Sequence, residues 1–417
     1  MKADLYVPAG VRVIRGNNLG EGLQLKGDFV HVTSGTADSL ASCCLTPGDL
    51  VFPHRGNIGE VGITPDDGHR YMLSTSLMKL SPNRSKVDPL YLLYFFKSVT
   101  GRAALLMNTS QVGTPGIATP LKSLRGIELA LPPLGIQRAI TAILQALDDR
   151  ISLLRETNAT LEAIAQALFK SWFVDFDPVR AKMEGRTPEG MDEATAALFP
   201  DGFETSELGE VPRGWLVQTF RDTIQIIGGG TPKTSNPDFW GGDIPWFSVV
   251  DAPGASDVFV IDTEKHITEA GLYGSSTKLL PAGTTIISAR GTVGKLALTG
   301  RAMAMNQSCY GLRGKVGDTF FTYFSATRLV QQLQQRAHGS VFDTITQDTF
   351  SGVHVAYPQA PVVQAFDTAV DALMARIREN LFQAQTLSTL RDTLLPRLIS
   401  GQLSLPEAQI ELKKAIV

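Results

Sequence analysis

The sequence predicts an α+β protein with two similar mixed α/β domains separated by two long helices, which are expected to form an antiparallel coiled coil within the chain. Three observations support this fold class. The 417 residues exceed what one hydrophobic core usually organises. Segments of the first half recur in the same order in the second half. A heptad series of apolar residues follows each copy.

The repeat is clearest in a block of turns and apolar runs. Residues 45–64 (LTPGDLVFPHRGNIGEVGIT) match residues 280–299 (LPAGTTIISARGTVGKLALT) at an offset of 235. Residues 71–80 and 302–312 follow in matching places. Further matches at an offset of 226 join Gly113, Gly126 and Pro132 to Gly339, Gly352 and Pro358. Ordered matches with small length changes indicate two diverged copies.

Each copy is predicted to mix strands and helices. Short apolar runs bounded by Gly, Asn or Asp are typical of strands, which we expect at residues 49–53, 126–131, 285–289 and 352–357. Between them, helices are expected at residues 91–107 and 322–337. The order of the strands does not follow from these patterns.

Two heptad series predict the long helices. Seam residues recur at steps of four and three, at positions 140, 144, 147, 151, 154, 158, 161, 165, 168 and 172. The same ten positions recur 226 residues later, from Phe366 to Leu398. Pro178 is expected to end the first helix. Pro396 is expected to end or kink the second, which would take Leu398 out of the seam.

If the two helices run antiparallel, the two residue numbers of every seam pair add up to the same value. Pairing the helices over their full length sets this sum at 538. This register pairs Trp172 with Phe366 and places Asn158 opposite Asn380, where a buried amide pair would fix the register at some cost in stability. Alternatively, each helix packs on its own domain and the asparagines mark an exposed edge. The residues expected to pair the helices are Leu147, Ile151, Leu154, Asn158, Leu161, Leu373, Ile377, Asn380 and Leu387.

These patterns divide the chain into six segments. They are a first domain (1–135), a first spacer helix (136–177), a linker (178–212), a second domain (213–361), a second spacer helix (362–403) and a C-terminal tail (404–417). A helix of roughly 33 residues would be about 50 Å long, because each residue adds about 1.5 Å. The helices are therefore expected to act as a rigid spacer.

The composition argues against several classes of protein. No stretch approaches the roughly 18 apolar residues of a membrane span, and the start lacks the pattern of a secretory signal. Cys43, Cys44 and Cys309 form neither a disulfide framework nor a C-x-x-C metal pair, so a reducing cytoplasm is expected. The histidines show no metal-binding spacing and stand at His31, His54, His69, His266, His338 and His354.

Charge is unevenly distributed along the chain, whose formal net charge is −3. Residues 1–135 carry 13 Lys and Arg against 10 Asp and Glu, and residues 213–360 carry 12 against 11. Residues 136–212 carry 7 against 14. Slightly basic domains are compatible with nucleic acid but bind its backbone weakly alone, so a partner is expected to supply much of the attraction.

Five segments resemble type I restriction-modification specificity subunits. They are KSWFVDFDPVRAKMEGRTPEGM (170–191), DGFETSELGEVPRGW (201–215), GGGTPKTSNPDFWGGDIPWF (228–247), ARGTVGK (289–295) and LLPRLISGQL (394–403). The resemblance covers nearly the whole chain, and the order of the segments is more specific than any one of them.

The resemblance implies a DNA-recognition subunit that is not itself an enzyme. In this family, two target-recognition domains each read one half of an interrupted, asymmetric site in double-stranded DNA. The helices that follow them hold the domains apart and dock two methyltransferase subunits, which use S-adenosylmethionine to methylate adenine N6. Motor subunits that use ATP and Mg add restriction, and hence phage defence. This chain is expected to bind no cofactor or metal.

One departure concerns the first domain. The second copy has PRGW (212–215) and a run of roughly 30 residues before IPWF (244–247), whereas VRVIRGNNL (11–19) stands near the start of the first copy. The start is thus expected to be misassigned, or the domain to be trimmed or complemented by another chain. Two alternatives for the protein are a specificity subunit of a modification-only or type II-like assembly, and a protein-binding coiled-coil scaffold.

Two motifs that suggest chemistry are incomplete. Residues 235–239 (SNPDF) carry Asp where the Asn/Asp-Pro-Pro-aromatic motif of adenine methyltransferases has its second proline, and residues 228–234 (GGGTPKT) are not a Walker A loop. We expect the glycine-rich loop to approach DNA, with Lys233 and Thr234 as contacts. A plain tight loop explains it equally well.

The repeated Arg-Gly-x-x-Gly motif has two interpretations. Arginine can bind guanine or phosphate, while the glycines equally suit a turn with positive φ. Asn306 and Gln307 differ from the matching Ser74 and Thr75, which favours base recognition, since Asn and Gln can bind adenine through two hydrogen bonds. The residues expected to contact DNA are Arg55, Asn57, Ser74, Thr75, Lys233, Thr234, Arg290, Asn306 and Gln307.

Aromatic residues at the end of the first spacer helix suggest a subunit interface. Trp172, Phe173 and Phe176 stand beside Asp175, and exposed aromatics at a helix end suit a partner's pocket. Packing onto the neighbouring domain is the alternative. Leu395 and Arg397, near the end of the second spacer helix, complete the expected interface.

Overall fold

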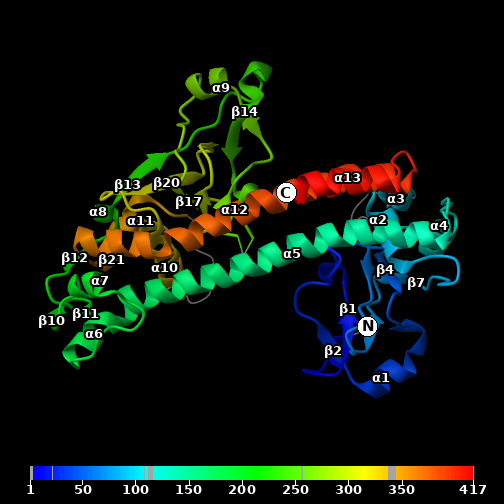
Figure 1. Ribbon diagram of the computed structural model, residues 1–417, viewed down its shortest axis with the longest axis horizontal. Coiled ribbons are helices and arrows are strands. Elements are labelled where there is room, and N and C mark those ends of the chain that lie inside the picture. Colours follow the sequence, from blue (N-terminus) through cyan, green and yellow to red (C-terminus); the bar gives the residue numbers. More distant parts are fainter. Residues whose placement is uncertain are drawn as a thin grey trace. The chain divides into compact units, whose positions relative to one another are not determined.

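Two long helices run through the computed structural model (Figure 1). Helix α5 spans Leu134–Lys170 and α12 spans Ala360–Ile399. The chain divides into two compact units, residues 1–152 with 385–417 and residues 153–384, so each unit contains a segment of both helices. The structure describes residues 3–20, 22–107, 109–110, 116–254, 257–336 and 344–416, and the repeat residues Gly113 and Gly339 and His338 lie outside it.

The first unit contains two main sheets. Their strand orders are β2-β1-β6-β3 (Val30–Val32, Val11–Ile14, Tyr71–Leu73, Cys44–Leu45) and β5-β4-β7 (Gly62–Ile63, Leu50–Pro53, Leu77–Leu80). A small pair is formed by β8 (Thr109–Ser110) and β9 (Gly116–Ile117). The shorter helices are α1 (Ser34–Ser39), α2 (Pro89–Lys97), α3 (Val99–Leu106), α4 (Pro120–Arg125) and α13 (Leu405–Ile416).

The second unit has a larger set of strands. Its five-stranded sheet has the order β13-β20-β17-β18-β15 (Ile224–Gly228, Cys309–Gly314, Thr285–Ser288, Leu296–Thr299, Phe259–Val260). A three-stranded sheet has the order β16-β14-β19 (His266–Ile267, Trp240–Phe247, Ala304–Met305). Two strand pairs are β10-β11 (Phe203–Ser206, Gly209–Pro212) and β12-β21 (Leu216–Thr219, His354–Tyr357). The shorter helices are α6 (Asp177–Met183), α7 (Glu193–Ala197), α8 (Phe220–Thr223), α9 (Glu269–Tyr273), α10 (Phe320–Arg336) and α11 (Gln347–Ser351).

The two domains repeat one strand register. β4 pairs with β7 so that Pro53 lies opposite Leu77, and β17 pairs with β20 so that Ser288 lies opposite Cys309. A parallel pair also recurs, formed by β1 with β6 in the first domain and by β14 with β19 in the second. The repeat predicted from the sequence is therefore a repeat of structure.

In the second unit, the two helix segments pair in the predicted antiparallel register. Asn380 Nδ2 donates a hydrogen bond of 2.8 Å to Asn158 Oδ1, and Asn158 Nδ2 donates one of 3.3 Å to the carbonyl oxygen of Ile377. Both asparagines are 1% exposed. The ring centroids of Trp172 and Phe366 lie 5.7 Å apart. The alternative, in which these asparagines mark an exposed edge, is wrong.

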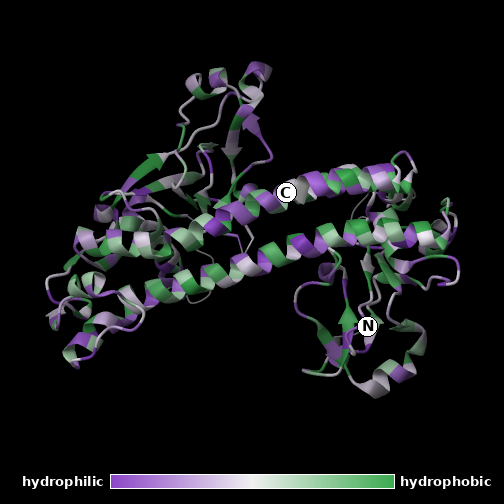
Figure 2. Ribbon diagram, viewed as in Figure 1, coloured by the Kyte–Doolittle hydropathy of each residue, from purple (hydrophilic) through white to green (hydrophobic). Residues whose placement is uncertain are grey.

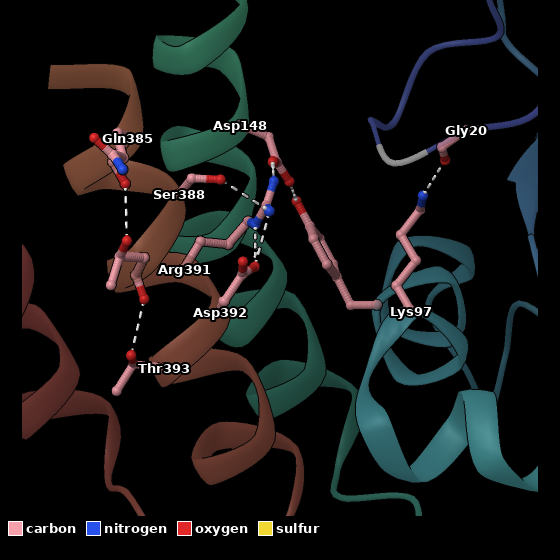
Figure 3. A network of polar contacts seen from close by, with 10 residues as sticks. Gly20, Lys97, Asp148, Gln385, Ser388, Arg391, Asp392 and Thr393 are labelled. Atoms are coloured by element: carbon pink, nitrogen blue, oxygen red, sulfur yellow. Dashed lines mark hydrogen bonds and ion pairs between the residues drawn. The ribbon is translucent and has the colours of Figure 1, made fainter. Parts of the chain in front are cut away.

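In the first unit, the seam contains a buried polar network (Figure 3). Arg391 Nη1 on α12 donates to Asp148 Oδ1 on α5 at 2.7 Å, and Tyr94 Oη on α2 donates to Asp148 Oδ2 at 2.6 Å. Burial, and then the charge of Asp148, raise the pKa of the Tyr94 hydroxyl. The network joins the domain to both helices. Around it the seam is apolar, with buried Leu147, Ile151 and Leu387.

The remaining predicted pairing residues follow the same pattern. Leu154 and Ile377 are buried, whereas Leu161 and Leu373 are half-buried against the aromatic core of the second unit. Figure 2 shows hydrophobic and hydrophilic residues alternating along both long helices. This alternation gives each helix one face to bury and one to expose.

The strand predicted at residues 126–131 is wrong, because residues 127–131 form no strand. The matching strand of the second domain, β21, pairs antiparallel with β12, so that Tyr357 lies opposite Leu216. Within the described part of the first unit, no strand pairs with residues 127–131. A strand needs a neighbouring strand to accept and donate its backbone hydrogen bonds. An apolar pattern alone, without such a neighbour, is therefore not sufficient to form a strand.

A second difference concerns the helix predicted at residues 91–107, which is broken into α2 and α3 at Ser98. The Ser98 hydroxyl accepts a hydrogen bond from Gly101 N and caps the new helix.

The first long helix ends before Pro178, as predicted, whereas Pro396 does not end the second helix. Pro396 lies inside α12, which continues to Ile399, and Leu398 stays 3% exposed. Only three residues follow Pro396 in the helix. The backbone hydrogen bond that this proline cannot donate is therefore missing from the last turn only, where its loss disrupts little of the helix. Pro178 lies in the first turn of α6, where no such bond is needed, after the π-helical turn Ser171–Asp175. The predicted linker 178–212 thus contains most of α6, with α7, β10 and β11.

Candidate nucleic-acid interface

In the second domain, two predicted contact sites meet at one end of the main sheet. Arg290 follows β17, and Gln307 precedes β20. The strand register continues beyond Ser288 and Cys309, because Ala289 N donates a hydrogen bond of 2.7 Å to the carbonyl oxygen of Ser308. Arg290, which bridges to Thr344, and Gln307 lie next to the two residues that share this hydrogen bond, and both are exposed.

The glycine-rich loop packs against the turn that carries Gln307. A Cβ atom at Gly229 would lie 1.9 Å from the carbonyl oxygen of Asn306, so only glycine fits this approach. Trp246 Nε1 donates a hydrogen bond of 3.0 Å to the carbonyl oxygen of Gly230, and the Thr231 hydroxyl donates to Gln307 Oε1. Parts of the sequence 76 residues apart thus form one surface.

The predicted contact residues of this surface differ in their exposure and in the hydrogen bonds that their side chains already make. Lys233 and Thr234 are exposed on the loop, whose backbone is held where Trp240 Nε1 donates to the carbonyl oxygen of Lys233 at 3.4 Å. Asn306 Oδ1 accepts a hydrogen bond of 3.0 Å from Ser308 N, so this side chain closes the turn. Gln307 is the more exposed of the two predicted adenine readers.

The first domain places its predicted residues in the matching turns. His54 N donates to the carbonyl oxygen of Ser76 at 3.0 Å. Arg55, which bridges to Gly116, and Thr75 lie next to these two residues, and both are exposed. The hydroxyls of Ser74 and Ser76 lie 3.2 Å apart. Asn57, which is exposed, donates through Nδ2 to the carbonyl oxygen of Gly16 at 3.5 Å.

The repeated Arg-Gly-x-x-Gly motif has a structural part and an exposed part. Its glycines adopt φ values of 80° and 92° at Gly56 and Gly59, and of 79° and 81° at Gly291 and Gly294. These left-handed conformations favour glycine and shape the turn. The arginines project from that turn into solvent and are the members free to bind a ligand.

The sequence reasoning did not identify Thr231 as a contributor to this surface. Its bond to Gln307 is a tertiary contact, and no local pattern predicts it. The consecutive glycines ahead of it were the available signal, because a segment without side chains suits a close approach of another backbone.

The predicted exposure of the aromatics at the end of α5 is wrong. Trp172 and Phe173 are 6% and 5% exposed, in a core cluster that also contains Phe366. Phe176 is half-buried with φ 58°, and its ring lies 5.6 Å from that of Trp215. The alternative, packing onto the neighbouring domain, is what the structure shows.

The other predicted interface residues lie in mixed surroundings. Asp175 forms an ion pair with Lys170. Leu395 is buried, at 7% exposed, and is therefore no free contact either. Arg397 is 39% exposed at its side chain and pairs with Glu411 at 3.3 Å. Of the six residues, Asp175, Phe176 and Arg397 keep surface for a partner.

The described residues contain neither a metal-binding cluster nor a membrane-spanning helix. Among them, no three His, Cys, Asp or Glu residues lie close enough together to hold a metal ion. No helix in the described ranges is long and apolar enough to cross a membrane.

The chain is similar to known proteins over most of its length. A family model described as the type I restriction modification DNA specificity domain matches residues 13–163 and 212–382. The chain is 30% identical to the type I restriction enzyme HindI specificity subunit of Haemophilus influenzae, over 91% of this chain and 92% of that protein. The MjaIX specificity subunit of Methanocaldococcus jannaschii is 26% identical over 40% of this chain and 41% of that protein.

Solved structures of low identity also match. The S subunit from M. genitalium is 14% identical with a TM-score of 0.49, over 95% of this chain and 91% of that one. The HsdS subunit from Thermoanaerobacter tengcongensis is 17% identical with a TM-score of 0.32, over 94% and 91%. The family model alone spans more than half of the residues, and the chain therefore belongs to the DNA specificity subunits of type I restriction-modification systems.

Proposed function

We propose that this chain reads a bipartite, interrupted DNA site, one half with each domain, and positions two adenine-N6 methyltransferase subunits on it. The observation that carries the proposal is the structural repeat. Each domain presents an exposed arginine and an exposed polar residue next to the same backbone hydrogen bond between two strands, Arg55 with Thr75 and Arg290 with Gln307. Two copies of one reading site with different side chains suit two different half-sites.

The chemistry would belong to the partners. A methyltransferase partner would bring S-adenosylmethionine and flip the target adenine into its own pocket, and motor subunits would bring ATP and Mg. The side chains of this chain would hold the DNA in register. Arginine would bind guanine or phosphate, and the free amide nitrogen of Gln307 would donate to a base.

The test is a genome-wide map of N6-methyladenine after this chain is co-expressed with a type I methyltransferase subunit. We expect one new interrupted, asymmetric motif. Arg290→Ala and Gln307→Ala should relax only one half of that motif, whereas Arg55→Ala and Thr75→Ala should relax only the other. Co-purification of the two proteins without any new motif would contradict the proposal.

The continuous helices α5 and α12 lead us to propose that they set the spacer of the site. Removing residues 151–157 and 381–387 together keeps the seam register, because both deletions take one heptad at paired positions. One heptad is about 10 Å of helix, close to the rise of three base pairs. A shorter spacer is expected, and an unchanged spacer would contradict the idea.

A further inference from the structure

The correspondence between the two domains extends beyond the turns already described. Thr33 caps α1 by accepting a hydrogen bond from Thr36 N, and Thr268 caps α9 by accepting one from Gly271 N, both at 3.1 Å. The offset between these caps is 235, the same as between β4 and β17. Asp38 and Tyr273 are therefore equivalent positions on the two helices.

A second pair of equivalent positions precedes the parallel strands. Leu45 lies opposite Tyr71, and Leu280 bridges to Met303, so Tyr71 matches Met303 and Arg70 matches Ala302. In the first domain, Arg70 Nη2 donates to Asp38 Oδ1 at 2.7 Å. In the second domain, the corresponding residues are Tyr273 and Ala302. Both positions of this pair have changed together.

Fold stability does not explain these side chains. Arg70 and Asp38 are 54% and 64% exposed, and an ion pair this exposed contributes little to stability. Tyr273 is 83% exposed and buries almost none of its ring. A large aromatic and a preformed arginine–carboxylate pair are, however, side chains that nucleic-acid interfaces use.

Tyr273 is held next to the candidate interface of its domain. A Cβ at Gly271 would lie 2.4 Å from the carbonyl oxygen of Phe239, so α9 sits tightly on the segment that joins the glycine-rich loop to β14. Just after α9, Ser276 approaches Gly230, where a Cβ would meet the serine hydroxyl at 2.3 Å. The backbone around Tyr273 is thus fixed to the loop that carries Lys233. Figure 1 shows α9 and the start of β14 projecting away from α10 and α12.

We propose that Tyr273 and the Asp38–Arg70 pair are specificity-determining residues, one set in each domain. The inference rests on the proposed function and extends the reading site of each domain to α1 or α9. Asp38 orients the Arg70 guanidinium for two hydrogen bonds to guanine O6 and N7. The ring of Tyr273 makes an apolar contact with a base edge, such as a thymine methyl group. One scaffold position thereby reads different bases in the two half-sites.

The test uses the full chain in complex with a methyltransferase subunit. Arg70→Ala and Tyr273→Ala are compared with Val99→Ala and Leu216→Ala, which shorten side chains that are 80% and 64% exposed elsewhere in the same units. Tyr273→Phe keeps the ring. The readouts are the methylation motif and the Kd for duplexes carrying the wild-type motif or one substituted base pair.

We expect each alanine variant to raise the Kd for the cognate duplex about tenfold and to relax a base in one half-site only. The controls and Tyr273→Phe should stay within about twofold of the wild type. Unchanged motifs and Kd values would overturn the inference, as would an equal loss on cognate and substituted duplexes. If the wild-type complex gave no motif at all, the proposed function itself would fail, and that result is distinct from a normal motif left unchanged by the variants.

Discussion

The Asn158–Asn380 pair leads to a prediction about coupled substitutions. Asn158 uses both of its polar atoms, since Oδ1 accepts from Asn380 Nδ2 and Nδ2 donates to the carbonyl oxygen of Ile377. Asn380 Oδ1 is buried without a hydrogen-bond partner. The two amides are therefore unequal, although the sequence makes them equivalent.

Asn158→Leu removes both hydrogen bonds and leaves the whole amide of Asn380 buried and unpaired. An unsatisfied buried polar group costs about 1–3 kcal/mol, so this variant should lose about that free energy of unfolding. Asn380→Leu leaves only Asn158 Oδ1 unpaired and removes an acceptor that had no partner. Its loss should be smaller. The double leucine variant leaves no orphaned amide and should be as stable as the wild type or more stable.

Hydrogen exchange of the α5 amides around Asn158, together with urea unfolding, would measure these free energies. Local exchange is preferred because a chain with two units need not unfold in one step. The expected order of stability is Asn158→Leu lowest, Asn380→Leu next, and the double variant at or above the wild type. Losses that simply add, within about 0.5 kcal/mol, would refute the coupling.

Three further predictions concern buried groups. Arg391→Ala should cost about 3 kcal/mol or more, because it leaves Asp148, 9% exposed, as an uncompensated charge. Adding Asp148→Met together with Tyr94→Phe removes both that charge and the hydroxyl that donates to it, and should largely restore the urea midpoint. Burial raises the pKa of Asp318 above its ordinary value, so the folded state binds its proton more tightly and stability should fall as pH rises through that raised pKa. Asp318→Asn should reduce this loss, which urea midpoints at pH 5 and pH 8 would show; an unchanged pH dependence would contradict it. Phe366→Ala should cost about 3–5 kcal/mol, because the ring is fully buried among aromatics, and a loss under about 1 kcal/mol in thermal unfolding would contradict this packing.

The helix pairing could be predicted because the heptad spacing of the seam residues is visible in the sequence. The constant sum of 538 predicts Asn158 opposite Asn380 from the sequence alone, since a heptad seam leaves few registers open, and the hydrogen bond between the two side chains confirms it. The repeat likewise predicted matching turns around Arg55 and Arg290. Both predictions rest on distant segments of the chain that repeat the same spacing of residues.

Burial and strand pairing could not be predicted in the same way. The sequence around Trp172 shows aromatics beside acidic residues, but not that a second domain covers them. Residues 127–131 have the alternation of a strand and lack the neighbour that β12 provides to β21. The meeting of Thr231 with Gln307 depends on the path of the whole domain, so local spacing carries no signal for it.

The two copies differ in chemistry where each domain meets the helices. At the offset of 226, Asp148 corresponds to Met374 and Arg391 to Ala165, both fully buried in the second unit. Aligning the aspartates that precede α2 and α10 sets Tyr94 against Phe324, which packs with its ring 5.7 Å from that of Phe169.

A polar network thus occupies in one unit the place of an aromatic cluster in the other. If each domain were placed on the helix segments that now carry the other domain, the Tyr94 hydroxyl would be buried against Met374 without an acceptor. Asp148 would then face Phe324. Each such unpaired buried group costs about 1–3 kcal/mol, so each domain is matched to its own segment of the helix pair. Under the proposed function, the order of the two half-sites would then be determined by domain–helix contacts as well as by chain order.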